Sequence, residues 1–346
     1  MKKPYGKIMA GLAIGAIISL LAASYGGAAD RELKRFNVGY LASTGHAMYF
    51  IAKEKGYFEQ EGLDVQLFLF TNSGEGMNAI TSGKLDAGSF GTAPPLLFIA
   101  KGADITIFGG QMSEGHGLVA KPEKAEQFKD LKNYRGKTIA TVRLQTGDVV
   151  FRGGLHHTGI DWKKDVTIKE LDSPGAVLEA VKKGSVDAGI LWPPFLTLAE
   201  QQGLKVAKLS GDILSGHTCC RQVTLTSKLK ANEADYVRFM RALIRAHAFY
   251  KTTPDETVDI TSKYVKIDKA ILKKDLYHGN LYLSPDPDKQ MVIHFWDYMN
   301  DAEYISSAKK VDAYINTGTF RKALDGLIRE YPNEKDYKAL KAAFRA

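Results

Sequence analysis

Four short polar stretches each precede an expected helix and could hold a small anion. They combine hydroxyl or amide side chains with glycine, as "STGH" at 43–46, "NSGE" at 72–75, "GTA" at 91–93 and "QTGD" at 145–148. Backbone N–H groups at helix N-termini, together with short hydroxyl side chains, bind small anions in proteins. The same residue types also cap helices without binding anything, so a purely structural role stays open for each stretch.

Acidic residues near these stretches would change the kind of ligand. Glu75 and Asp148 belong to two of these stretches, and Glu114 is a third candidate acid outside them; any of the three that is buried against the ligand would argue against plain nitrate. An acid that faces the ligand favours a molecule carrying an amine or another hydrogen-bond donor. Asp148 has a second interpretation, since an acid in the first turn is a common helix cap.

The stretch "SGHTCCRQ" at 215–222 contains the only two cysteines of the chain. His217, Cys219 and Cys220 form a set of soft ligands that could hold a transition metal. Adjacent cysteines rarely bridge one another because the geometry is strained. The alternatives are that both are small buried apolar residues, or that they line a ligand site without chemistry. Arg221 could instead make paired contacts to an anion.

Known catalytic patterns are absent from the sequence. There is no Gly-x-Ser-x-Gly elbow, no His-Glu-x-x-His and no phosphate-binding loop. His156 and His157 lie in an expected helix without a carboxylate at metal-binding spacing, which favours a solvent-exposed position. We therefore expect no catalytic residues, no metal and no cofactor.

Two stretches about a hundred residues apart read alike. Residues 82–102 and 183–203 each contain Asp-Ala-Gly in an apolar run, then Pro-Pro, then a helix-like segment that ends in glycine. Proline suits the first turn of a helix, and ligands of open α/β sheets bind beyond the carboxyl ends of strands. Two such corners facing each other would form a cleft, with Trp192 placed to stack on a flat or apolar part of a ligand. Common βα turns of no functional meaning are the alternative.

Short strand-like and helix-like runs alternate from residue 36 onward, which predicts an α/β fold with a largely parallel sheet. In the first series we expect strands at 36–41, 63–70, 85–90 and 104–110, and helices at 47–62, 74–83 and 94–102. In the second series we expect strands at 137–142, 166–171, 186–191 and 204–209, and helices near 148–158, at 175–184 and at 193–203. Beyond a strand at 223–227 the pattern is nearly all helical.

The N-terminus has the order of a secretory signal. Lys2, Lys3 and Lys7 precede an uncharged apolar run and then small residues, so we expect residues 1–29 to be a cleaved signal peptide. A retained membrane anchor is the alternative, although the run is short for a spanning helix. Loss of the three lysines would lower the net charge from +8 to +5. The remaining charges alternate in sign, which disfavours nucleic acid as a partner.

Several stretches in order resemble the periplasmic solute-binding proteins of nitrate, sulfonate, taurine and bicarbonate importers, together with the related thiamine-pyrimidine group. They are "VGYLASTGHAMYFIAKEKGYFEQEGLDVQL", "SGEGMNAITSGKLDAGSFGTAPPLLFIAKG", "LDSPGAVLEAVKKGSVDAGILWPPF" and "VTLTSKLKANEADYVRFMRALIRAHAFYKTTPDE". The resemblance covers about residues 36–256. It implies a type II periplasmic binding fold, in which two α/β lobes close on a ligand in the cleft between them.

The same resemblance implies a domain order and partners. Lobe 1 would comprise residues 30–115 and the return segment 222–346 with its C-terminal helices, and lobe 2 would comprise 116–221. The protein would be a periplasmic monomer and no enzyme, and it would deliver a small, anionic solute to the permease subunits of an ABC importer. A receptor in place of the permease is an alternative that the sequence leaves open.

An enzyme that resembles the fungal thiamine-pyrimidine synthases, or a binder of pyrimidine precursors, is the alternative function. Those synthases have a cysteine cluster associated with iron at the position of "SGHTCCRQ", and this chain has only two of the cysteines. The candidate ligand-binding residues share a position at a strand end, a helix start or this cysteine segment. They are Thr44, Gly45, His46, Ser73, Gly74, Glu75, Gly91, Thr92, Ala93, Gln145, Thr146, Gly147, Asp148, Trp192, Pro193, His217, Cys219 and Cys220.

Overall fold

A computed structural model describes residue 1 and residues 32–345 of the chain. The contacts divide the chain into a unit Met1–Leu33 and a unit Lys34–Ala346, and the second unit contains all the helices and strands that the structure describes. The expected signal peptide lies almost entirely outside the described residues. Within 32–345, no helix is both long and apolar enough to span a membrane.

The first of two sheets has six strands in the order β11-β4-β10-β3-β1-β2. Its strands are β1 (Lys34–Leu41), β2 (Leu63–Phe70), β3 (Ala87–Ser89), β4 (Ile105–Glu114), β10 (Thr218–Leu225) and β11 (Leu281–Leu283). The helices that follow its first strands are η1 (Thr44–His46), α2 (Ala47–Glu54), α3 (Tyr57–Gln60), α4 (Ser73–Thr81) and α5 (Ala93–Ala100). We call this sheet and its helices lobe 1.

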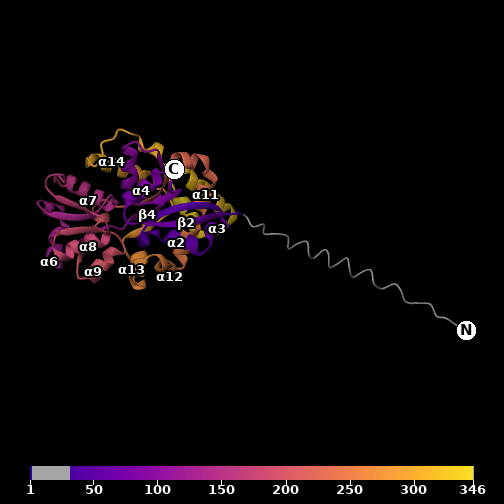
Figure 1. Cartoon of the computed structure of the whole chain (residues 1–346), viewed down its shortest axis with the longest axis horizontal. Helices are drawn as coiled ribbons and strands as arrows, with labels where there is room; N and C mark the ends of the chain where they lie inside the picture. The colour runs from indigo at the N-terminus through magenta and orange to yellow at the C-terminus, as the bar shows by residue number, and fades with distance from the viewer. Residues whose placement is uncertain (2–31, 346) are drawn as a thin grey trace. The chain divides into compact units, whose positions relative to one another are not determined.

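The second sheet has five strands in the order β7-β6-β8-β5-β9. Its strands are β5 (Gly117–Ala120), β6 (Thr138–Val142), β7 (Thr167–Leu171), β8 (Ala188–Leu191) and β9 (Lys205–Leu209). Its helices are α6 (Pro122–Ala125), η2 (Gln127–Lys129), η3 (Leu131–Tyr134), α7 (Thr146–His157), α8 (Pro174–Lys183), α9 (Phe195–Gln201) and η4 (Ser210–Asp212). We call this part lobe 2, and it lies beside lobe 1 in Figure 1.

The prediction of a largely parallel sheet is wrong, because both sheets are mixed. Strands β1, β2 and β3 are parallel to one another, as are β6, β7 and β8. The strands that carry the chain between the lobes pair antiparallel to these, namely β10 with β3 and β5 with β8. The two Asp-Ala-Gly corners contain β3 and β8, which occupy the same place in the two sheets, beside the first parallel strand. The repeated stretch therefore marks one supersecondary unit built once in each lobe.

Several expected elements differ in extent. The helix predicted at 47–62 is divided into α2 and α3, since Gly56 has a φ of 66° in the left-handed region that glycine adopts at low cost. The helix predicted from Pro193 begins two residues later, at Phe195. Strand β10 is longer than the expected 223–227 and includes both cysteines. The short strands β5 and β11 have no counterpart among the expected elements.

The chain crosses between the lobes at two places. Strand β4 passes into β5 through Gly115 and His116, and the return runs from β9 and η4 into β10. The backbone of Glu114 lies in the left-handed region at the first crossing, where its side-chain Oε1 accepts a hydrogen bond of 2.7 Å from the Gly216 backbone N–H of the second crossing. Residues 218–221, expected in lobe 2, belong to β10 of the six-stranded sheet.

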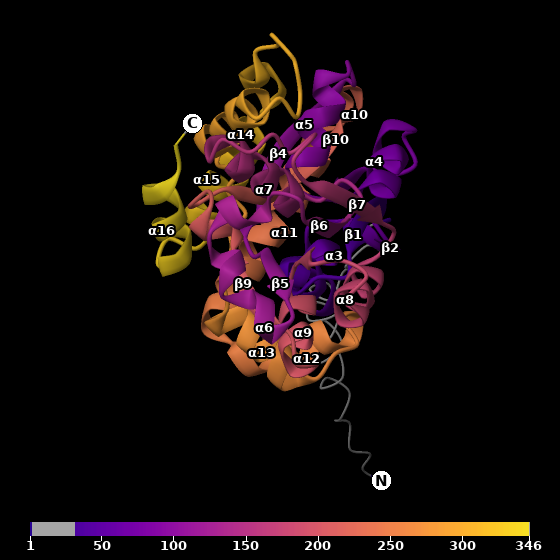
Figure 2. The same cartoon turned by 90° about the vertical axis from the view of Figure 1, so that its left-hand side faces the viewer.

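The C-terminal helices cover lobe 1 and reach lobe 2. They are α10 (Thr226–Ala231), α11 (Glu233–Thr252), α12 (Pro254–Tyr264), α13 (Lys269–His278), α14 (Lys289–Asp301), η5 (Val311–Tyr314), α15 (Gly318–Glu330) and α16 (Lys335–Ala343). Helix α11 buries Phe239 against Phe36, with ring centroids 5.1 Å apart, and α15 packs on α11. Helices α15 and α16 lie side by side at one edge of the unit (Figure 2). Helix α14 contacts α7 of lobe 2, where Tyr298 Oη donates to the Val150 carbonyl at 2.7 Å.

A buried acid lies where α13 meets α9 of lobe 2. Thr197 Oγ1 donates to Asp275 Oδ1 at 2.6 Å, and Asp275 Oδ2 has no partner among the described residues. Burial raises the pKa of Asp275 to about 6, while the bond from Thr197 lowers it in part. Since the folded pKa exceeds the ordinary value of 3.8, the free energy of unfolding falls as the pH rises from about 4 to about 6. The fall is about 3 kcal/mol at most.

We expect the Asp275→Asn variant to be more stable than the native chain at pH 7, by about 1–3 kcal/mol, because it removes the ionised form and keeps an oxygen for Thr197. Urea unfolding at several pH values between 4 and 7 measures the free energy of unfolding. In the native chain this free energy should fall as the pH rises, and in the variant it should not. Asp259→Asn, on the exposed side of α12, is the control and should leave the slope in place. A variant with the native slope would show that Asp275 does not titrate in this range.

Candidate functional site

A small pocket lies between the two lobes. About 330 Å³ of space within it and at its mouth is free of atoms. The thirteen residues that line it include no charged side chain. They are Leu41, Ser43, His46, Ser73, Phe90, Gly91, Met112, His116, Gln145, Thr146, Trp192, Cys219 and Cys220. The polar groups come from both lobes, so the pocket exists only where the lobes meet.

Helix N-termini converge on this pocket. Ser73 is the first residue of α4 and Thr146 the first residue of α7, and both line the space. Gly91 precedes Thr92, the N-cap of α5. Each of these helices has eight or more residues, so its N-terminal N–H groups carry partial positive charge that favours an anion. These N-termini give the pocket a positive potential from the backbone.

The Thr146 hydroxyl joins the two lobes. Its Oγ1 accepts hydrogen bonds from the backbone N–H groups of Thr92, at 2.9 Å, and Ala93, at 3.3 Å, and donates to the Cys219 carbonyl at 3.1 Å. Two further bonds cross between the lobes at the opposite wall. Ser43 Oγ donates to the Pro193 carbonyl at 3.2 Å, and Trp192 Nε1 donates to the Ala42 carbonyl at 3.2 Å. The structure is therefore a closed form of the two-lobed molecule.

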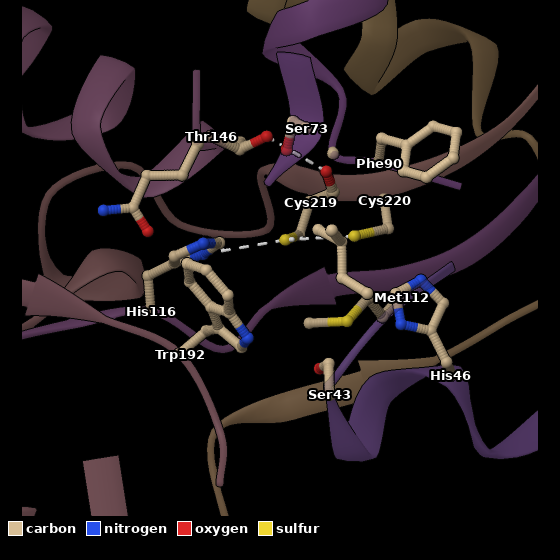
Figure 3. A pocket seen from close by; sticks show the side chains of 13 residues that line it. Ser43, His46, Ser73, Phe90, Met112, His116, Thr146, Trp192, Cys219 and Cys220 are labelled. Carbon is tan, nitrogen blue, oxygen red and sulfur yellow. Dashed lines mark hydrogen bonds between the residues drawn. The ribbon is translucent and has the colours of Figure 1, made fainter. Parts of the chain in front are cut away.

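A β-bulge turns both cysteines toward the pocket. In β10, Thr218 pairs with Ser113 and Cys220 pairs with Met112, so Cys219 is an extra residue opposite β4. Successive side chains of a regular strand point to opposite faces, and a bulge re-aims one of them. The two Sγ atoms lie 3.7 Å apart as free thiols, and Cys219 Sγ lies 3.6 Å from His116 Nδ1 (Figure 3).

Burial keeps the two histidines of the pocket wall neutral at pH 7. Burial lowers the pKa of His46 to about 4 and that of His116 to about 3, with the nearby His217 adding to the second shift. Burial raises the pKa of Cys219. The Cys219 thiol donates a hydrogen bond to the sulfur of Cys220 and thereby lowers the pKa of Cys220, so Cys220 is the more acidic thiol.

The structure brings eight of the predicted site residues together in the pocket lining. They are His46, Ser73, Gly91, Gln145, Thr146, Trp192, Cys219 and Cys220. Ten others do not line it. They are Thr44, Gly45, Gly74, Glu75, Thr92, Ala93, Gly147, Asp148, Pro193 and His217.

Two of the glycines that do not line the pocket allow close packing behind it. A Cβ atom at Gly147 would lie 2.5 Å from ring atoms of His116, and one at Gly45 would lie 1.9 Å from the sulfur of Met112. Any side chain at either position would push a pocket-lining residue aside. These glycines let a helix start approach the pocket wall.

The charged and metal-ligand candidates have other partners. Asp148 is buried and bonds Arg152 of its own helix, with its Oδ2 3.0 Å from Nε. His217 Nε2 lies 2.9 Å from Ser210 Oγ, away from the pocket. Glu75 is exposed. Within residues 32–345, no three His, Cys, Asp or Glu side chains are arranged to hold a metal ion.

Arg221 uses its guanidinium on the backbone. It is fully buried and donates to the carbonyls of Pro287, Met112 and Cys220, each at 2.8 Å. These bonds hold β10 and β4 together beside the bulge. Arg221 therefore does not line the pocket, and its guanidinium is bonded to the backbone.

Five lining residues are not among the candidate residues, namely Leu41, Ser43, Phe90, Met112 and His116, although Ser43 lies in the predicted stretch 43–46. Three are apolar and read as ordinary core residues. His116 stands between two glycines in "GHG" at 115–117, at a crossing between the lobes. This residue could have been predicted, because it is a histidine flanked by glycines at the point where the second α/β series begins.

The two lobes and the pocket between them define the fold as that of the two-lobed periplasmic binding proteins. Two solved structures share this fold. A periplasmic nitrate-binding protein from Synechocystis PCC 6803 matches with a TM-score of 0.73 at 16% identity, covering 86% of this chain and 89% of its own. The ligand-binding component of an ABC-type import system from Staphylococcus aureus matches with a TM-score of 0.72 at 17% identity, covering 84% and 99%.

The chain belongs to the NMT1-like family, whose model matches residues 29–265. A protein of Brucella abortus (strain 2308), named as a binding protein, is 28% identical over 72% of this chain and 77% of its own length. A Bacillus subtilis (strain 168) protein named for aliphatic sulfonate binding is 27% identical over 75% and 80%. A 4-amino-5-hydroxymethyl-2-methylpyrimidine phosphate synthase of Schizosaccharomyces pombe is 31% identical over only 35% of this chain and 36% of its own.

Proposed function

We propose that this protein is the substrate-binding component of an ABC importer. It captures a small, anionic solute of the sulfonate, taurine or nitrate class in the pocket between the lobes and delivers it to membrane permease subunits. The observation that carries the proposal is the pocket itself, in which the N-termini of α4, α5 and α7 meet between two lobes. The names of the sulfonate-binding and nitrate-binding proteins that this chain resembles support the same solute class.

Localisation and assembly belong to the same proposal. The leader at 1–29 would direct the chain to the periplasm and be cleaved there. The mature protein would act as a monomer, divided into lobes near residues 115 and 217. It would perform no chemistry on the solute, since capture and release through lobe motion suffice for delivery.

Binding in the pocket predicts a loss of affinity when its aromatic wall is removed. Trp192 is buried and bonds Ala42 across the lobes, so Trp192→Ala should weaken solute binding by about 10–100-fold, as expected for a central aromatic contact. Isothermal titration calorimetry with nitrate, taurine and ethanesulfonate measures it. Tyr331→Ala, at an exposed aromatic residue, is the control and should bind as the native chain does. If none of these solutes gives saturable binding at micromolar concentrations or below, the proposed solute class is wrong.

An enzyme resembling the pyrimidine phosphate synthases is the second candidate. The partial match to the Schizosaccharomyces pombe synthase and the two thiols in the pocket favour it. It requires purified protein to contain stoichiometric iron that is lost in Cys219→Ser. Metal analysis of the native chain and this variant separates the two candidates.

A further inference from the structure

The amide of Gln145 leaves one strong acceptor in the pocket wall without a donor. Its Nε2 donates to Thr141 Oγ1 at 2.6 Å and to the Ile190 carbonyl at 3.1 Å. A carbonyl can only accept, so the contact with Ile190 fixes which end of the amide carries the hydrogens. The other end, Oε1, is buried and has no partner among the described residues.

A second acceptor comes from the other lobe. His46 lines the same pocket, and its Nε2 lies 3.0 Å from the Ser89 carbonyl, so that nitrogen carries the hydrogen. The ring is neutral because burial lowers its pKa to about 4. Nδ1 is then a lone-pair acceptor, and it has no hydrogen-bond partner within the described part of the chain.

Three strong donors of the pocket lining are already committed to other acceptors. Trp192 Nε1, Ser43 Oγ and Thr146 Oγ1 all donate to backbone carbonyls. Buried acceptors are nearly always paired in folded proteins, and one left unpaired is destabilising. Nitrate and simple alkanesulfonates at neutral pH have no hydrogen to donate.

We infer that the solute carries an N–H or O–H donor that binds Gln145 Oε1, with His46 Nδ1 as a second acceptor for a donor that has more than one hydrogen, in addition to the acceptor group that faces the helix N-termini. Gln145 is in this sense the residue that selects among solutes of similar size. The inference rests on the proposed function, since it assumes that the pocket holds a small solute. The absence of charged side chains from the lining favours a solute that balances its own charge, as an aminosulfonate does.

Three sulfonates of one length test the inference on the native full chain. 2-Aminoethanesulfonate and 2-hydroxyethanesulfonate each end in a donor, and propane-1-sulfonate, which has the same number of non-hydrogen atoms, ends in a methyl group. Isothermal titration calorimetry should show both donor-bearing compounds binding at least tenfold more tightly than propane-1-sulfonate, as a hydrogen bond to a buried acceptor implies. Equal affinity for all three would overturn the inference and leave the proposed function standing. No saturable binding of any of them would overturn the proposed solute class, and the inference with it.

A substitution at Gln145 tests whether this residue causes the preference for donor-bearing sulfonates. Gln145→Met keeps the length of the side chain and removes the acceptor, so the tenfold preference should fall to about threefold or less. Gln202→Met, at an exposed position, should keep the native preference. A Gln145→Met protein that folds, by its thermal unfolding curve, and retains the full preference would show that Gln145 does not make the selection.

Discussion

The Asp148→Asn variant is expected to lose about 3–5 kcal/mol of unfolding free energy, because it leaves a buried guanidinium without its carboxylate. The Asp148 and Arg152 side chains are only 1% and 9% exposed, and Asp148 Oδ2 lies within 3.0 Å of both Nε and Nη2 of Arg152. The remaining acid near Arg152 is Glu170, whose oxygen lies 3.4 Å away and whose side chain is 41% exposed. Water screens that acid, so it compensates poorly for the lost partner.

Chemical denaturation of the native chain and the variant at pH 7 measures the loss. Asp172→Asn is a matched control in the same lobe, since the Asp172–Arg143 pair is exposed and should change stability by at most about 1 kcal/mol. The double variant Asp148→Asn/Arg152→Met should recover part of the loss, because it removes the unpaired charge as well. Equal stability of Asp148→Asn and the native chain would show that the buried pair is not ionised in the folded state.

The ion pair between Asp148 and Arg152 could have been predicted from the sequence. Asp148 and Arg152 are four residues apart in an expected helix, and that spacing alone indicates an ion pair on one helix face. The position of Asp148 at a helix start indicated a ligand contact instead. The hydroxyl and amide residues at the starts of α4 and α7 were easier to predict, because a helix N-terminus is encoded locally by its capping residues.

The remainder of the site depends on contacts between distant segments. Cys219 faces the pocket beside Cys220 only because β10 is bulged against β4, and a bulge follows from the register of the two strands. The short strand β5, "GLVA", has no turn signal of its own and becomes a strand through its pairing with β8 and β9. Parallel order was predicted from the alternation of elements, and the crossing strands β5 and β10 reverse it.

The last expected result concerns closure of the lobes. Thr146→Val has nearly the shape of threonine but removes the hydroxyl that accepts from Thr92 and Ala93 and donates to Cys219. In the closed form the variant would bury two N–H groups and one carbonyl without partners, at about 1–3 kcal/mol each. Opening of the lobes lets water reach these groups, so the open form should gain at the expense of the closed one.

Small-angle X-ray scattering should therefore give a larger radius of gyration for Thr146→Val than for the native chain. If the lobes instead stay closed, the free energy of unfolding of the variant should be about 2–5 kcal/mol lower than that of the native chain. Thr146→Ser keeps the hydroxyl and should behave as the native chain does. Thr218→Val is the matched control, since the Thr218 hydroxyl is buried and has no partner among the described residues. A Thr146→Val protein with native dimensions and native stability would mean that the bonds across α5 and α7 do not hold the lobes together. The closed pocket would then depend on Ser43 and Trp192 at its opposite wall.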